Sequence, residues 1–411
     1  MSEEQQAPLE PGSDDSGNGD ERSRAGRTLF REITGVGVDW RSALLVPVLA
    51  VFTAIVLGAV IIAVTDIDAL RIWGSQPGEA FTETWTTIKD AYISLFQGAF
   101  GSMSGWSETL TSAAPLILTG LAVGLGFRAG LFNIGAEGQM LMGGLVATIV
   151  GFYFDLPMVI HLPFALLGGI VGGALWGGIP GLLRAKTGAH EVISTIMLNW
   201  IAIFFINWVL RTSFLQTAGR DDPISKDIAT TARLPRFSDD PTFRLHAGII
   251  VALVAAFFIF WLLYRSTIGY EFRAVGFNPD GAHYAGMSVT WLYVAVMAVS
   301  GAMAGLAGAN QILGVLDRAT PGFSAGLGFD AIALALLGRS HPAGIVLAGL
   351  LFGALEAGGR EMQAATDVSI DLILVLQALI VVFIAAPALI RAIYRVRTGE
   401  GAEQMTRGWA S

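Results

Sequence analysis

The sequence predicts an all-α polytopic membrane protein with about ten transmembrane helices. Of its 411 residues, 53% are hydrophobic and only 14% are charged, and the mean hydropathy is +0.61. A soluble domain carries about 25% charged residues, so this composition argues against one. The 51 glycines fit the same class, because small residues allow membrane helices to pack closely.

Both ends of the chain are predicted to be cytoplasmic tails. Residues 1–37 are rich in Glu, Asp, Ser, Gly and Arg and have no apolar period, so we expect them to be disordered. Residues 38–397 form the predicted membrane domain, and residues 398–411 form the second tail. Arginines flank the first and last spans, which favours cytoplasmic ends by the positive-inside rule. They are Arg22, Arg24, Arg27, Arg31 and Arg41, and Arg391, Arg395, Arg397 and Arg407.

Each long apolar stretch is predicted to be one span, since crossing a bilayer takes about 20 helical residues. The stretches are Ala43–Val64, Leu110–Phe127, Leu131–Phe154, Met158–Leu183, Val192–Leu210, Ala247–Tyr264, Trp291–Leu316, Phe323–Gly338, Ala343–Gly359 and Leu372–Ile390. Stretches broken by glycine are also compatible with half-helices, which leaves the count uncertain by about one. Glycines at small-xxx-small spacing in the fourth stretch predict tight helix contact. They are Gly168, Gly169, Gly172, Gly173 and Gly177.

Two polar segments are predicted to lie outside the cell. Residues 65–108 carry six acidic residues against two basic ones. Within them, an amphipathic helix is expected near Phe81–Phe100, lying on the membrane surface. Residues 211–244 form a polar loop large enough for external contacts.

Polar side chains within the predicted spans are the candidate functional residues. An acid at bilayer depth is costly, so Glu137 should face the protein interior or a watery cavity. Asn133 lies four residues earlier, and the two side chains share one face if the segment is helical. These groups either satisfy one another and lock helices together, or line a solute path, and the sequence leaves both readings open. The candidates for such a pathway are Phe132, Asn133, Glu137, Gln139, Asn199, Asn310 and Asp330.

A weak internal repeat connects two of these acids. Residues 126–144 and 328–349 each hold an acid in a short span interrupted by glycines. Such pairs often mark inverted repeats around a central pathway. A chance similarity between two glycine-rich helices explains the pattern equally well.

A short helix is predicted within the polar cytoplasmic segment 265–290. Asn278 is a good helix cap, and Pro279 suits the first helical position. Asp280 lies in the first turn, where the helix dipole favours a negative charge, and Gly286 suits a left-handed stop. The residues of this element are Asn278, Pro279, Asp280, Gly281, Ala282, His283, Tyr284, Ala285 and Gly286. On this evidence alone, a plain connector remains the alternative.

Several chemistries lack support in the sequence. The absence of cysteine excludes disulfides and thiolate sites, and the five histidines show no metal spacing. Residues 181–187 come nearest to a phosphate-binding loop, but Ala185 stands where that loop needs glycine. No serine lies in a Gly-x-Ser-x-Gly elbow, and nothing suggests nucleic-acid binding. We therefore expect no enzyme activity, no bound metal and no nucleotide site in this chain.

The octet Phe132-Asn-Ile-Gly-Ala-Glu-Gly-Gln139 resembles the signature of permease subunits of nucleoside-type ABC importers. These belong to the group that includes ribose and branched-chain amino-acid permeases, and the similarity runs from about Leu44 to Ile390. The resemblance implies that Asn278–Gly286 is the coupling helix, which docks into a cleft on the ATPase subunit. The family pattern resembles Gly-x-Asn-Pro-x-Ala-Ala-x-Tyr-Ala-Gly, and here Gly281 replaces the first alanine.

The resemblance also implies a set of partners in a prokaryotic plasma membrane. These are an ABC ATPase that uses ATP and Mg²⁺, a second homologous permease, surrounding lipid, and an extracytoplasmic solute-binding protein or lipoprotein that delivers a nucleoside or related sugar-containing solute. A heterodimer of two non-identical permeases is favoured over a homodimer. The alternative is an ion-coupled secondary transporter, with Glu137, Asp330 and Glu356 as proton or sodium sites. An intramembrane enzyme would need convergent catalytic groups, and the sequence shows none.

Overall fold

The computed structural model describes residues 40–366 and 368–394, and the predicted all-α class is confirmed there. Every regular element of the described residues is helical, apart from two isolated β-bridges. Residues 47–396 form one compact unit, which contains all the sites discussed below. The predicted tails at 1–37 and 398–411 lie outside the described residues.

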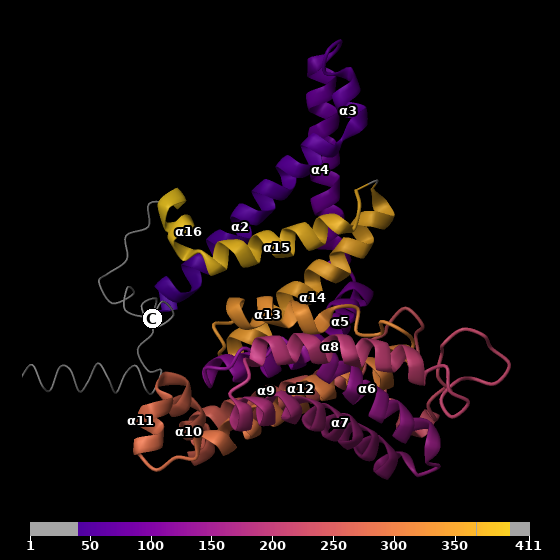
Figure 1. The fold of residues 1–411 in the computed structure, drawn as a ribbon. Coiled ribbons are helices and arrows are strands. Elements are labelled where there is room, and N and C mark those ends of the chain that lie inside the picture. The colour runs from indigo at the N-terminus through magenta and orange to yellow at the C-terminus, as the bar shows by residue number, and fades with distance from the viewer. Residues whose placement is uncertain (1–39, 367, 395–411) are drawn as a thin grey trace, which may run out of the picture. The chain divides into compact units, whose positions relative to one another are not determined.

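The helices follow one another along the chain with short connections, except for a long loop after α8 (Figure 1). They are α2 (Trp40–Thr65), α3 (Ile67–Ile72), α4 (Pro77–Phe100), α5 (Met103–Arg128), α6 (Ala136–Tyr153), α7 (Met158–Thr187), α8 (Glu191–Val209), η1 (Thr230–Ala232), α9 (Gly248–Arg265), α10 (Thr267–Phe277), α11 (Pro279–Tyr284), α12 (Val289–Gln311), η2 (Ile312–Leu316), α13 (Leu327–Leu337), α14 (Pro342–Ala365), α15 (Asp371–Ala385) and α16 (Pro387–Tyr394).

Each of the ten predicted spans corresponds to a helix, but the helices differ in length. Among the described residues, seven are long and apolar enough to cross a membrane: α2, α5, α7, α8, α9, α12 with η2, and α14. The other three are α6, α13 and α15. Phe323–Gly338 was predicted as a full span, yet α13 has only 11 residues. At 1.5 Å per residue, α13 covers about half of a bilayer core. It is short because the preceding residues, 317–326, form turns.

The helix expected near Phe81–Phe100 is present and starts earlier, at Pro77. It packs along α14, where Gly98 lies against Glu361 and Gly358 lies against Leu95. Its buried side chains are small: Ala80, Thr84, Ala91 and Ala99. Packing against α14 therefore explains why one face of α4 is buried. The location of α4 on the membrane surface stays a prediction.

Backbone-to-backbone contacts join α6, α7 and α12. A Cβ built on Gly173 of α7 would lie 2.2 Å from the carbonyl oxygen of Gly301, and one on Gly305 would lie 2.2 Å from that of Gly169. Gly143 of α6 meets Gly305 in the same way. The predicted tight contact at these glycines is confirmed, because no residue with a side chain fits between these helices.

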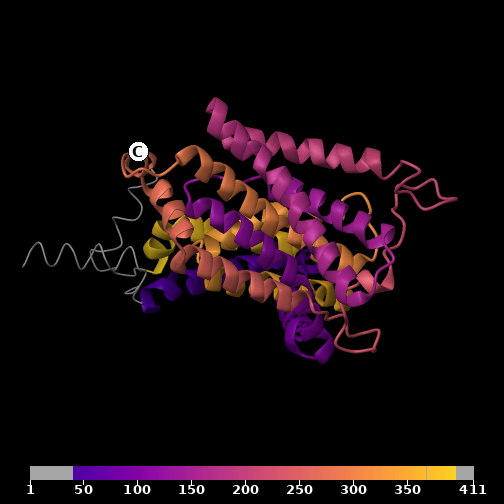
Figure 2. The ribbon, with the colours of Figure 1, turned by 90° about the horizontal axis from the view of Figure 1, so that it is seen from below.

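The short helices α10 and α11 and the long loop after α8 lie at opposite ends of the compact unit (Figures 1 and 2). This placement agrees with the prediction that residues 265–290 face one side of the membrane and residues 211–244 face the other. Which of the two ends is cytoplasmic stays a prediction based on charge.

Candidate functional site

Residues 129–135 form a turn between α5 and α6, here called the signature turn. It contains the first four residues of the octet, and the last four begin α6. Gly130 adopts a left-handed φ of 69°. A Cβ built on Gly130 would lie 3.1 Å from the Cα of Gly276, at the end of α10. The turn therefore lies directly against the segment that leads into α11.

Two amide side chains hold this turn to α12. Asn133 donates from Nδ2 to Gln139 Oε1 at 2.9 Å and to Ser300 Oγ at 2.6 Å. Gln139 donates back from Nε2 to Asn133 Oδ1 at 3.0 Å. The Ser300 hydroxyl donates in turn to the carbonyl of Ala122 on α5. Asn133, Gln139 and Ser300 are buried, so this network links α5, α6 and α12 without contact with solvent.

The side chain of Asn199, on α8, forms hydrogen bonds with the backbone at the start of α6. Its Oδ1 accepts from the backbone N–H of Gly138 at 2.9 Å, and its Nδ2 donates to the carbonyl of Ile134 at 2.8 Å. The residue is 1% exposed. A helix begins with N–H groups that lack partners inside the helix, and Asn199 satisfies one of these from a neighbouring helix. Its position indicates a bracing role for α8.

Glu137 joins the first turns of α6 and α13. It accepts from the hydroxyl of Ser324 at Oε1 and from the backbone N–H of Gly328 at Oε2, the latter at 2.9 Å. The two backbones touch, since a Cβ on Gly328 would lie 2.3 Å from Glu137 N and Cα. Two helix N-termini thus meet at one carboxylate, whose negative charge suits the positive ends of both dipoles.

Asn133 and Glu137 therefore have different partners and do not bond to each other. Ser324 was not among the residues singled out from the sequence. It lies in a turn without motif or regular period, so only the folded structure brings it to Glu137. Gly328 begins the second repeated segment, and it contacts Glu137, in the middle of the first.

A small cavity of about 190 Å³ lies beside Glu137. The apolar part of its wall comes from α6 and α8: Leu141, Ile203 and Ile206. The polar part includes Glu137, Asn207 of α8, Ser324 and the backbone of the turn at 322–326. Here the candidate site is hollow, in contrast to the packed network around Asn133.

The remaining candidates lie elsewhere. Asp330 is half-buried on α13, within electrostatic range of Glu137 and Glu356. Asn310 is buried at the far end of α12, where Nδ2 donates to the carbonyl of Gly248 at 3.0 Å. Phe132 is 38% exposed and packs on Phe127, with ring centroids 4.9 Å apart. Of the seven predicted pathway residues, three form a braced core, Glu137 lines the cavity, and three lie at separate positions.

The predicted helix at Asn278–Gly286 has the expected ends. The Asn278 side chain accepts from the backbone N–H of Gly281 at 2.9 Å, Pro279 opens the helix, and Gly286 adopts a φ of 86°. The regular part, α11, has six residues, Pro279–Tyr284, so it is shorter than the predicted element Asn278–Gly286. Ala282 is 4% exposed and packs into this chain, whereas Tyr284 is 91% exposed.

The exposed face of this element is therefore aromatic. Phe277, at the end of α10, is 94% exposed and lies next to the Asn278 cap. Ala285, His283 and Asp280 are exposed as well. Ala282 faces the interior of this chain, so any docking surface consists of Phe277, Tyr284 and their exposed neighbours.

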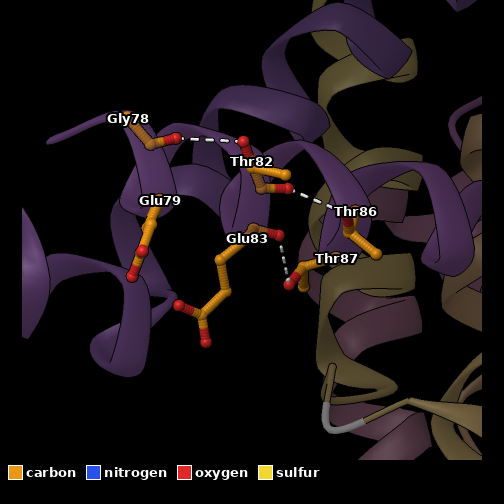
Figure 3. Close-up of a pocket in the computed structure, with 6 residues that line it drawn as sticks. All are labelled: Gly78, Glu79, Thr82, Glu83, Thr86 and Thr87. Carbon is orange, nitrogen blue, oxygen red and sulfur yellow. Dashed lines mark hydrogen bonds between the residues drawn. The ribbon is translucent and has the colours of Figure 1, made fainter. Parts of the chain in front are cut away.

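A larger, shallow hollow of about 670 Å³ lies along the outer face of α4 (Figure 3). Gly78, Glu79, Thr82, Glu83, Thr86 and Thr87 line it. The threonine hydroxyls donate to carbonyls one turn earlier in α4, as in Thr86 to Thr82 at 2.8 Å. Because the polar groups come from one helix and are directed along it, this hollow lacks the convergent groups of a binding site.

Within the described part of the chain, no group of three His, Asp or Glu residues is placed to hold a metal ion. His246 and Asn310 come close together at Gly248, and the buried atoms His246 Nε2 and Asn310 Oδ1 lack hydrogen-bond partners there. This pair links the start of α9 with the end of α12.

Comparison with known proteins gives a consistent result. A family model described as the permease component of branched-chain amino acid transport systems matches residues 105–385. The guanosine ABC transporter permease protein NupP of Bacillus subtilis is 40% identical over 85% of this chain and 95% of its own length. The glucose ABC transporter permease protein TsgB13 of Haloferax volcanii is 36% identical, over 82% and 86%. The nucleoside ABC transporter permease protein NupB of Lactococcus lactis is 34% identical, over 84% and 92%. No solved structure matches.

Proposed function

This chain belongs to the permease family of branched-chain amino acid-type ABC transport systems, and we propose that it forms half of the membrane pathway through which an ATP-driven importer takes up a nucleoside. The support for a nucleoside comes from two relatives, which are named for guanosine and for nucleosides. A third is named for glucose. A nucleoside and a hexose share a hydroxylated sugar ring, so this ring is the part of the solute on which the proposal depends most.

The ATPase is a separate subunit in this proposal. It hydrolyses ATP with Mg²⁺ and contacts the chain at the element formed by α10 and α11. Phe277 and Tyr284 support this, because exposed aromatic side chains, here at the two ends of α11, are typical anchors of a protein interface. The remaining proposed partners are a second, non-identical permease and an extracytoplasmic binding protein, in a prokaryotic plasma membrane with both chain ends in the cytoplasm.

The contact between Gly276 and the signature turn is the observation that carries the coupling mechanism. A Cβ on Gly276 would lie 2.4 Å from the carbonyl oxygen of Arg128, so the backbones of α10 and of the turn touch. A displacement of α11 by the ATPase would push this turn directly, since no side chain lies between to absorb it. The turn leads into α6, which contributes Glu137 and Leu141 to the lining of the cavity.

The experiment is reconstitution of the chain in proteoliposomes with its ATPase, second permease and binding protein. Uptake of radiolabelled guanosine should require ATP and all partner subunits. Ala285→Arg should abolish ATPase co-purification, or its stimulation by loaded binding protein, while the permease stays folded, because Ala285 is exposed outside the membrane spans. Uptake by this chain alone, driven by a proton or sodium gradient, would establish the secondary transporter instead.

A further inference from the structure

The wall of the cavity beside Glu137 combines apolar and polar side chains. Leu141, Ile203 and Ile206 supply only hydrocarbon. The polar wall consists of a carboxylate, an amide and a hydroxyl, from Glu137, Asn207 and Ser324. A sugar ring has the same division, with C–H bonds on its faces and hydroxyl groups around its edge. A purely apolar solute would leave the polar wall unsatisfied, and such desolvation costs free energy.

The polar wall can accept hydrogen bonds from a ligand. Asn207 donates from Nδ2 to the carbonyl of Ile203 at 2.9 Å, and within the described residues its Oδ1 has no hydrogen bond. Glu137 has two oxygens, each with more than one acceptor position, and each now accepts one bond. A sugar hydroxyl can add to this set or replace the Ser324 hydroxyl, which has the same chemistry.

A cation suits the cavity less well than a hydroxyl group. The N-terminus of α13 lies at the carboxylate, and the Gly328 N–H points to it. The positive end of the helix dipole therefore already compensates the charge of Glu137. A neutral hydroxyl donor still gains a charge-assisted hydrogen bond there, whereas a sodium ion meets a positive helix end.

The size of the cavity limits which part of the solute it holds. Sites that bury a whole drug-sized ligand have volumes of about 300–1,000 Å³. The 190 Å³ available here is below that range. A single sugar ring fits such a space, and the base of a nucleoside would lie outside it.

We propose that this cavity is a sugar-ring subsite of the translocation pathway. Glu137 and Asn207 accept hydrogen bonds from the ring hydroxyls, and Leu141, Ile203 and Ile206 contact its C–H face. This assignment rests on the proposed import of a nucleoside. It makes Asn207 and Glu137 determinants of specificity for the hydroxylated sugar, independently of the base.

The test is uptake by the full transporter in proteoliposomes, with guanosine compared with 2′,3′-dideoxyguanosine. Each nucleoside is supplied at concentrations that saturate the binding protein, so that the preference of that protein does not enter the ratio. In the wild type, the maximal uptake rate for guanosine should exceed that for the dideoxy compound about tenfold or more, because hydrogen bonds to a charged group are lost. In Asn207→Leu and Glu137→Gln this ratio should fall to within about threefold.

Thr86→Val is the matched control, because Thr86 lines the other hollow, on α4, and should leave the ratio unchanged. Ile203→Phe fills the cavity from its apolar wall and should slow both nucleosides, while the ATPase still co-purifies. An equal ratio in wild type and in Asn207→Leu overturns the subsite, as does sodium-dependent uptake that Glu137→Gln abolishes. If the wild type takes up neither nucleoside, the proposed function itself fails, which is a different outcome from an unchanged ratio.

Discussion

The glycine contact between α7 and α12 gives a sharp prediction for Gly173→Ala. The new Cβ would lie 2.2 Å from the carbonyl oxygen of Gly301, whereas ordinary contact begins at 3.4 Å. The helices must therefore separate by about 1.2 Å (3.4 − 2.2), because the atoms that the new Cβ meets belong to the backbone of Gly301 and Gly305 and have no rotamer to change. Overpacking of this kind costs roughly 1–3 kcal/mol.

Gly178→Ala is the control in the same helix, since a Cβ there meets nothing within 4 Å. Alanine is favoured over glycine inside a helix by roughly 0.5–1 kcal/mol, so this variant should be as stable as the wild type or slightly more. Because this gain is common to both variants, they should differ by the overpacking cost alone, about 1–3 kcal/mol. The assay is the midpoint of thermal unfolding in one detergent, followed by size-exclusion chromatography. Equal midpoints for the two variants would refute close backbone contact between α7 and α12.

Three further outcomes follow from the structure. Asn278→Ala removes the cap of α11, worth about 1 kcal/mol, and should lower ATPase stimulation by loaded binding protein with only a small fall in the unfolding midpoint; full stimulation would contradict a role for a rigid α11. Asn199→Ala leaves two buried backbone groups without partners at about 1–3 kcal/mol each, so its unfolding midpoint should fall, and an unchanged midpoint would contradict the bracing role. Burial, with the nearby Arg236 and Arg244, lowers the pKa of His246 from 6.5 to about 4. Because the unfolded chain then binds this proton more readily, stability should fall as pH drops from 6.5 towards 4, by on the order of 3 kcal/mol, and His246→Asn should show less of this loss.

The sequence predicted the elements that depend on local chemistry. The cap at Asn278, the proline start and the left-handed Gly286 are local preferences of single residues, and the structure confirms them. The same holds for the glycine spacing in α7, since residues four apart share a face of a helix and their helical context was clear from hydropathy.

Contacts between distant segments were less predictable. The sequence indicated that Glu137 needs partners, but Ser324 is 187 positions away in an irregular turn. The length of α13 was overestimated, because residues 323–326 are apolar enough to extend a span, and their turn geometry depends on packing against α6. Ala282 has the same small side chain as Ala285, and only the tertiary structure shows which of them is buried.

The backbone contacts among α6, α7 and α12 also determine which parts of the molecule can move. A joint without side chains has no rotamers to exchange, so it transmits a displacement but does not yield to it. We expect these three helices to behave as one rigid lever, with the signature turn as the point where force enters. The compliant parts are then α8 and the turn at 322–326, which contact α6 through the side chains of Asn199, Glu137 and Ser324, whereas α13 itself touches the α6 backbone at Gly328. Any opening of the cavity would occur along that seam, where each hydrogen bond can be exchanged for one to a passing solute.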